Sequence, residues 1–155
     1  MSSELRELYQ EVILDHGRAP RNFGKPDGAN HHAHGHNPLC GDKVTVHLKL
    51  NGDVVEDVGF EGSGCAISMA STSLMTEVLK GKTVAEAHAL FHRFHDLIAG
   101  SHDSREDETV DPDAFERLTV LSGVSEFPMR VKCATLAWHT MEAAIQGEAD
   151  KVSTE

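Results

Sequence analysis

The stretch KVTVHLKLNGDVVEDVGF, residues 43–60, decides the fold class of this chain. Apolar and polar side chains alternate over residues 43–50, which is the period of a strand with one buried face. Asn51-Gly52 follows, a dipeptide that suits a type I′ hairpin turn, and residues 54–60 continue with valines and a phenylalanine. The stretch therefore predicts an antiparallel β-hairpin.

The segments around the hairpin predict how its apolar face is covered. Residues 4–16 place apolar side chains at helical intervals and predict an N-terminal helix. Residues 17–38 are rich in Gly, Pro and Asn and predict a long loop. The glycine-rich residues 61–65 predict a short third strand or a bend.

Helical spacing dominates the rest of the sequence. We expect helices over four stretches, residues 67–79, 83–99, 112–121 and 131–146. Strands that precede a run of helices indicate an α+β fold. The predicted architecture is an N-terminal helix, a small antiparallel three-stranded sheet, and a group of C-terminal helices packed on that sheet.

Length and charge narrow the function classes. The 155 residues predict a single domain over 1–155, with residues 1–3 and 148–155 frayed. Fourteen Lys and Arg against 25 Asp and Glu give a formal net charge of -11, which repels phosphate backbones and anionic lipid. We therefore expect no nucleic-acid or membrane partner. Because no signal peptide or membrane-spanning run is evident, we expect a cytoplasmic protein.

The three cysteines, Cys40, Cys65 and Cys133, each lie at the end of a predicted element, where side chains from distant segments can converge. Three thiolates and one carboxylate match a tetrahedral zinc site. Asp42 is the natural fourth ligand, because residues two apart in extended chain point to the same side. The positive ends of helices should lower the pKa of Cys65 and Cys133.

Residue types alone leave three interpretations of these cysteines open. A metal site is one, although the chain has no Cys-x-x-Cys pair to signal it. Three buried or incidental thiols are another, and a disulfide with one spare thiol is the third. A zinc site of this composition would carry net negative charge, and Arg130 and Lys132 are the cations next to Cys133. Arg130 could pair with Asp42, or it could be a solvated arginine at a helix start.

Three segments carry a resemblance to a known family. They are NPLCGD (residues 37–42), FEGSGCAISMAS (residues 60–71) and FPMRVKCATLAW (residues 127–138). In this order they resemble the cysteine motifs of the IscU/SufU (NifU N-terminal-like) iron–sulfur cluster assembly family. The opening motif at residues 8–22 is also similar, and the similarity extends to about residue 144.

Two features place the resemblance in the SufU branch. IscU-type scaffolds carry a histidine immediately before the third cysteine, where this chain has Lys132. Residues 100–126 resemble the insertion of SufU-type proteins. The IscU chaperone-binding motif is not reproduced by residues 127–131, so the resemblance does not imply an Hsp70 partner.

The resemblance implies a zinc-dependent sulfurtransferase, with Zn2+ held by Cys40, Asp42, Cys65 and Cys133. It implies a SufS-type cysteine desulfurase as partner, which the chain stimulates, and persulfide sulfur accepted on Cys40. A partner histidine would replace Cys40 on zinc, and the sulfur would pass to a downstream Suf-type scaffold. One alternative is a scaffold that binds iron and assembles a [2Fe–2S] cluster on the same residues, and another is a zinc-stabilised module that only recruits partners.

Two groups of histidines have no place in that scheme. His31, His32, His34 and His36 predict either a secondary metal-capture site or a solvated loop. The second group, His88, His92 and His95, has helical spacing. For this second group we favour surface or partner contact over metal binding.

Overall fold

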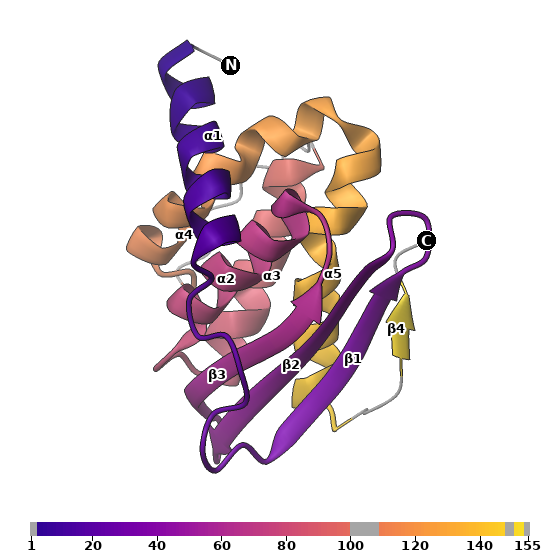
Figure 1. Ribbon diagram of the computed structural model, residues 1–155. Coiled ribbons are helices and arrows are strands. Elements are labelled where there is room, and N and C mark those ends of the chain that lie inside the picture. The colour runs from indigo at the N-terminus through magenta and orange to yellow at the C-terminus, as the bar shows by residue number, and fades with distance from the viewer. Residues whose placement is uncertain (1–2, 100–108, 148–150, 154–155) are drawn as a thin grey trace.

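The computed structural model describes residues 3–99, 109–147 and 151–153 (Figure 1). The elements in chain order are α1 (Ser3–Arg18), β1 (His31–Asn37), β2 (Asp42–Asn51), β3 (Val54–Ser63), α2 (Ala66–Leu79), α3 (Val84–Ile98), α4 (Pro112–Leu118), the 3-10 helix η1 (Thr119–Glu126), α5 (Pro128–Ile145) and β4 (Lys151–Ser153). Most of the predicted frayed ends, and residues 100–108 of the predicted insertion, lie outside the described residues.

One sheet and the helices on it confirm the predicted α+β class. The strand order is β3-β2-β1-β4, with β1, β2 and β3 antiparallel and the short β4 parallel to β1. Figure 1 shows the helices gathered on one face of the sheet, with α5 running behind β1 and β2. None of the described helices combines the length and apolar character that crossing a bilayer requires.

The loop predicted over residues 17–38 is wrong for its last part, because residues 31–37 form strand β1. The segment HHAHGHN lacks the apolar alternation that identifies a strand in a sequence. In the structure Ala33, Gly35 and Asn37 are buried, while the histidines between them lie on the other face. Pairing with β2 along its whole length makes this polar segment a strand, so tertiary context overrides local propensity.

Helix boundaries in the C-terminal half also differ from the prediction. The helix expected at 112–121 ends at Leu118 and continues as η1 to Glu126. The last helix starts at Pro128 rather than Val131, since proline is tolerated in a first turn, where no N–H is needed. The glycine-rich residues 61–63 extend β3, so the third antiparallel strand is β1.

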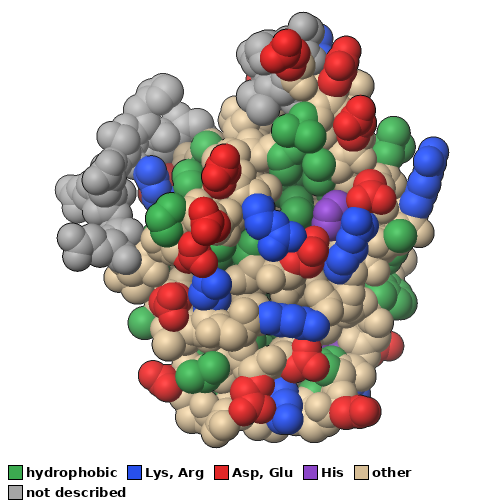
Figure 2. Space-filling model, turned by 90° about the vertical axis from the view of Figure 1, so that its left-hand side faces the viewer, with side chains coloured by type: hydrophobic (Ala, Val, Ile, Leu, Met, Phe, Trp, Pro, Cys, Tyr) green, Lys and Arg blue, Asp and Glu red, His purple; other side chains and the backbone are tan. Residues whose placement is uncertain are grey.

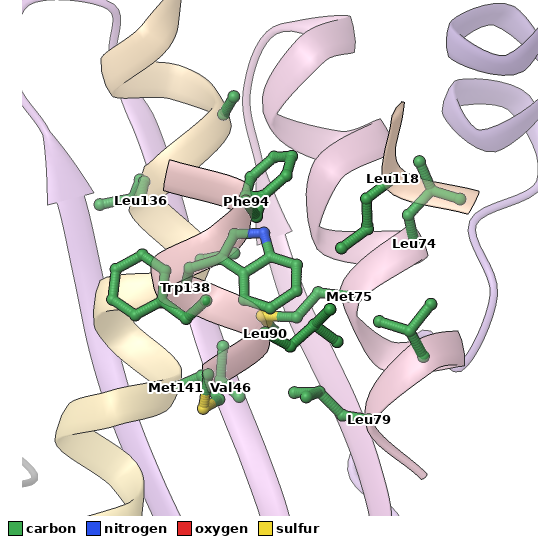
Figure 3. Close-up of a cluster of buried hydrophobic side chains, with 14 of the residues drawn as sticks. Val46, Leu74, Met75, Leu79, Leu90, Phe94, Leu118, Leu136, Trp138 and Met141 are labelled. Atoms are coloured by element: carbon green, nitrogen blue, oxygen red, sulfur yellow. The ribbon is translucent and has the colours of Figure 1, made fainter. Parts of the chain in front are cut away.

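The core lies between the sheet and the helices and centres on Trp138 of α5 (Figure 3). Trp138 is fully buried, and its ring lies 5.0 Å from that of Phe94 on α3, centroid to centroid. The indole N–H donates to Ser71 Oγ at 3.2 Å, and that hydroxyl donates to the Ala134 carbonyl at 2.6 Å. The indole therefore buries its ring without leaving a buried donor unpaired.

Oppositely charged side chains pair across the surface, which offsets part of the acidic excess locally. Lys82 Nζ lies 3.0 Å from Asp111, and Arg117 lies 2.9 Å from Glu77. Figure 2 shows basic and acidic side chains interspersed over the face that carries α1 and α4. The acidic balance of the sequence thus does not form one uninterrupted acidic patch on this face.

A buried histidine attaches α1 to α2. His16 Nδ1 lies 2.6 Å from Ser73 Oγ, and the same hydroxyl accepts the Arg21 N–H at 2.8 Å. Burial lowers the pKa of His16, and the Arg21 charge lowers it further, against the opposing effect of Glu77. The lowered pKa favours the neutral form of His16, which holds the end of α1 against α2.

We expect this histidine to make stability depend on pH. The folded-state pKa is below the unfolded value of about 6.5, so the unfolded chain takes up the proton first as the pH falls. The contribution of His16 to the free energy of unfolding is therefore complete above about pH 6.5 and declines as the pH falls below it. Urea unfolding of wild type and His16→Ala from about pH 7.5 to about pH 5.5 should show their difference in unfolding free energy shrinking. Parallel curves would contradict this role.

Close packing of β1 on α5 yields a second prediction. A Cβ atom at Gly35 would overlap Thr140 Oγ1 and crowd Leu136, whereas one at Gly17 would meet nothing within 4 Å. Gly35→Ala should lower the free energy of unfolding by about 1–3 kcal/mol, the usual cost of overpacking. Gly17→Ala, a matched control on a helix, should be neutral or slightly stabilising. Equal stability of the two variants in urea unfolding would argue against the described contact.

Candidate metal centre

Two chain segments far apart in sequence, the β1–β2 turn and the start of α5, meet at one end of the sheet (Figure 1). Cys40 lies in the turn between β1 and β2, Asp42 begins β2, and Cys133 lies on α5. One possible ligand atom from each of these residues lies within 4.8 Å of the other two. The two sulfur atoms are 3.3 Å apart, so the structure gathers three of the four predicted ligands directly.

The turn that carries Cys40 depends on Asn37 and Gly41. The Gly41 N–H donates to the Asn37 carbonyl at 2.8 Å, and the Leu39 N–H donates to Asn37 Oδ1 at 3.1 Å. Gly41 has a φ of 73°, a left-handed conformation that favours glycine. The turn leaves the Cys40 side chain exposed while Asp42, two residues on, is fully buried.

Cys65 is linked to the centre by its contacts with Asp42. Its backbone N–H donates to Asp42 Oδ1 at 2.8 Å, and its sulfur lies 3.7 Å from Asp42 Oδ2. A Cβ atom at position 64 would come within 2.5 Å of Oδ1, so Gly64 makes room for the carboxylate. Cys65 is also the N-cap of α2, since its sulfur accepts the Ser68 N–H at 3.4 Å. Cys65 therefore lies at the N-terminus of α2, the position that the sequence predicts for it.

The predicted lowering of the Cys133 pKa is wrong. Burial raises the pKa of this thiol, and hydrogen bonding to Asp42 and Cys40 raises it further. The prediction fails because α5 starts at Pro128, which puts Cys133 in the second turn, where the dipole effect has faded. A buried thiol beside a carboxylate keeps its proton until a cation replaces that proton.

Arg130 supplies positive charge at the mouth of the site. The side chain is exposed, and the charge of Cys65 together with a hydrogen bond to Cys133 raises the pKa of its guanidinium. Sequence reasoning offered Asp42 as a possible partner of Arg130, whereas the structure places Arg130 beside the sulfurs of Cys65 and Cys133. A guanidinium here lowers the cost of gathering several anionic ligands.

Two residues near the centre escaped sequence reasoning. Tyr9, assigned only to the apolar stripe of α1, is buried near enough to Arg130 and Cys65 that both influence its pKa, which burial raises. Asn37 is almost fully buried, and its Nδ2 has no hydrogen-bond partner within the part of the chain that the structure describes. For Asn37, the Asn37-Pro38 dipeptide is the signal that the sequence offers.

The donor set fits a zinc ion. Zinc bonds of about 2.3 Å to sulfur and about 2.1 Å to oxygen, at tetrahedral angles, separate two sulfurs by roughly 3.8 Å and a sulfur from an oxygen by roughly 3.6 Å. The 3.7 Å contact between Cys65 and Asp42 is close to the sulfur–oxygen distance, and the 3.3 Å contact between Cys40 and Cys133 is about 0.5 Å shorter than the sulfur–sulfur distance. The Cys65 sulfur contacts Asp42 but is not in the group of atoms that lie within 4.8 Å of one another, so its side chain has to move closer before three sulfurs and one oxygen can share one ion.

Comparison with known proteins gives a consistent result. Residues 8–134 match the model of the NifU-like N terminal domain family. The chain is 42% identical over 147 residues to the zinc-dependent sulfurtransferase SufU of Bacillus subtilis, covering 95% of each chain. It is 37% identical over 148 residues to the iron–sulfur cluster assembly scaffold protein IscU of Streptococcus pyogenes, covering 96% of this chain and 89% of that protein.

Solved structures agree with these sequence comparisons. An iron–sulfur cluster assembly scaffold protein for the SUF system from Fervidobacterium islandicum superposes with a TM-score of 0.78 at 36% identity. That match covers 90% of this chain and 97% of the other. A NifU-like protein from Brucella abortus has the same TM-score of 0.78 at 24% identity, which speaks for the fold alone.

Removal of the carboxylate should weaken metal binding. We expect Asp42→Ala to bind Zn2+ at least about tenfold more weakly, because it loses a ligand and the acceptor for the Cys65 N–H. Asp27→Ala, which removes an exposed carboxylate, is the control and should bind as wild type does. Competition with a chromogenic chelator measures both affinities. Unchanged affinity in Asp42→Ala would mean that another residue is the fourth ligand.

Proposed function

The chain belongs to the NifU-like N-terminal domain family of IscU/SufU iron–sulfur cluster assembly proteins, and on that premise we propose that it is a zinc-dependent sulfurtransferase. It accepts persulfide sulfur from a SufS-type cysteine desulfurase on Cys40. It then passes that sulfur on to a downstream Suf-type scaffold. The relative with 42% identity is named for this activity, which supports the proposal.

The observation that carries the proposal is the unequal exposure of the gathered donors. Cys40 is exposed in a turn, whereas Asp42 and Cys133 are fully buried. A sulfur acceptor has to reach a persulfide on another protein, and a buried thiol cannot do so without unfolding its surroundings. Cys40 is therefore the acceptor, and Asp42, Cys65 and Cys133 are the residues that would hold the ion.

The transfer step balances without an added oxidant or reductant. The Cys40 thiolate attacks the outer sulfur of the partner's persulfide and forms a new S–S bond. The S–S bond of the partner breaks, and its cysteine leaves as a thiolate. Cys40 now carries the persulfide, and the same exposed position lets a second acceptor take the sulfur.

Zinc, when bound, keeps the sulfurs deprotonated and protects them from oxidation. The protein supplies the remaining requirements of the site. Asp42 is fixed by the Cys65 N–H, which holds the carboxylate on the donor side. The Arg130 guanidinium beside Cys65 and Cys133 stabilises negative charge on those two sulfurs. They can therefore stay deprotonated when Cys40 leaves the site.

Exposed apolar side chains near the reactive cysteine suit a protein partner. Leu39, Phe127 and Met129 are 61%, 52% and 62% exposed. Leu39 precedes Cys40, and the other two lie at the start of α5, the helix that carries Cys133. An apolar rim around a reactive residue is typical of a surface that a partner covers. We assign this rim to the desulfurase.

A scaffold role on the same residues is the second candidate, because relatives with 37% identity are named as cluster assembly scaffolds. In that role iron and sulfide are cargo assembled into a [2Fe–2S] cluster, and Cys40 is a cluster ligand. Purified protein separates the two functions: colourless protein with one zinc per chain supports sulfur transfer, whereas brown protein supports the scaffold. We further propose one domain over 1–155, a SufU-type insertion at 100–126, and a cytoplasmic location.

The function is tested by tracing sulfur. With a SufS-type desulfurase and radiolabelled cysteine, wild-type protein should carry the label on Cys40. Cys40→Ser should lose the label and the stimulation of the desulfurase, because a hydroxyl does not replace the thiolate nucleophile. Ser122→Ala, a change in η1 that removes none of the candidate ligands, is the control. Label retained by Cys40→Ser would exclude Cys40 as the acceptor.

A further inference from the structure

A second group of metal-binding side chains lies where α3 packs beside α5. His88 and His92 are one helical turn apart on α3, and both are exposed. Residues at this spacing share one face of a helix, which is why paired histidines four residues apart recur in zinc sites. Glu142 faces them from α5. None of these residues takes part in the proposed sulfur transfer.

The two imidazoles point a nitrogen at each other. His88 Nε2 and His92 Nε2 are 3.0 Å apart, and the ring centroids are 4.4 Å apart at an interplanar angle of 76°. Two nitrogens at this distance need one proton between them, since two lone pairs would repel. Two imidazoles on one zinc, with bonds of about 2.0–2.1 Å, hold their nitrogens about 3.3 Å apart. A metal ion can therefore replace the shared proton with little movement of either ring.

Glu142 prepares His88 as a ligand. Its Oε1 lies 2.6 Å from His88 Nδ1, and its side chain is only 18% exposed, which limits its freedom. A carboxylate on one ring nitrogen fixes the proton there and leaves the lone pair on the other. The nitrogen left free in this way is Nε2, the one directed at His92.

His92 is held by the core, while the site stays open to solvent. Its ring stacks on Phe91 at a centroid distance of 5.9 Å, and Phe91 stacks on Trp138 at 6.0 Å. The His88 side chain is 56% exposed, so an ion can approach and water can fill the remaining coordination positions.

We propose that His88 and His92 form a second site for a divalent transition-metal ion, with Glu142 as a positioning residue. Imidazole nitrogen suits Zn2+, Ni2+ and Cu2+. Glu142 follows Cys133 by nine residues on α5, a rise of about 13–14 Å, so this site shares no ligand with the cysteine centre. The spacing of the histidines along α3 led us to favour surface or partner contact over metal binding. The carboxylate that orients His88 belongs to Glu142 on α5, so that spacing does not reveal it.

Other histidines provide matched controls. His32 and His34 lie on β1, on the face of the sheet away from the helices, with ring centroids 5.5 Å apart. They are exposed like His88 and His92, but no carboxylate contact is described for them. They therefore test whether any exposed pair of histidines in this chain would bind the same ion.

The test is a calorimetric titration of Ni2+ into the full chain after one equivalent of Zn2+ has filled the cysteine centre. His92→Ala should lose the Ni2+ site, and Glu142→Gln should weaken it about tenfold, as removal of such a carboxylate usually does. The double variant His32→Ala/His34→Ala should keep it. Because His92 is exposed and alanine favours helix, folding should be intact, which circular dichroism checks.

Two results would overturn the proposal. One is Ni2+ binding by His92→Ala within about twofold of the parent. The other is loss of binding in His32→Ala/His34→Ala alone, which would place the ion on the sheet. The readout is Ni2+ binding to the parent protein and not sulfur transfer, so failure of the proposed function would leave this result standing.

Discussion

The hydrogen bond from the Cys65 N–H to Asp42 Oδ1 is the interaction on which the candidate centre depends. It joins the start of β2 to the N-cap of α2, and so links the two ends of the β2-β3 hairpin. A carboxylate as buried as Asp42 is costly unless it is paired, so its partners determine where it lies. Gly64 allows the approach, and the sulfurs of Cys40, Cys65 and Cys133 lie around this fixed group.

Helix α5 carries three separate tasks along its length. Cys133 lies at the cysteine centre, and Glu142 faces His88 on α3. Between them Trp138 fills the core between the helices and the sheet (Figure 3). Because one rigid helix carries all three, the packing of Trp138 sets the position of both groups of ligands. Loss of core packing should therefore disturb both ends of the helix, although no ligand is removed.

Sequence reasoning succeeded where local pattern and tertiary environment agree. The hairpin over residues 43–60 was predictable because alternation and an Asn-Gly turn both favour it. Strand β1 was not, because His32 and His34 give no apolar signal and pairing with β2 decides their conformation. The Cys133 pKa was also misjudged, since its direction depends on burial and on where α5 begins.

The sequence by itself determined the α+β class, the family, and the residue types available as ligands. These follow from short-range pattern and from motifs that can be read along the chain. Only the tertiary structure decided which donors meet, that Cys40 is exposed while Asp42 and Cys133 are buried, and that Glu142 from α5 orients His88 on α3. The reason is that distances between segments far apart in the chain are set by packing, which no local periodicity encodes.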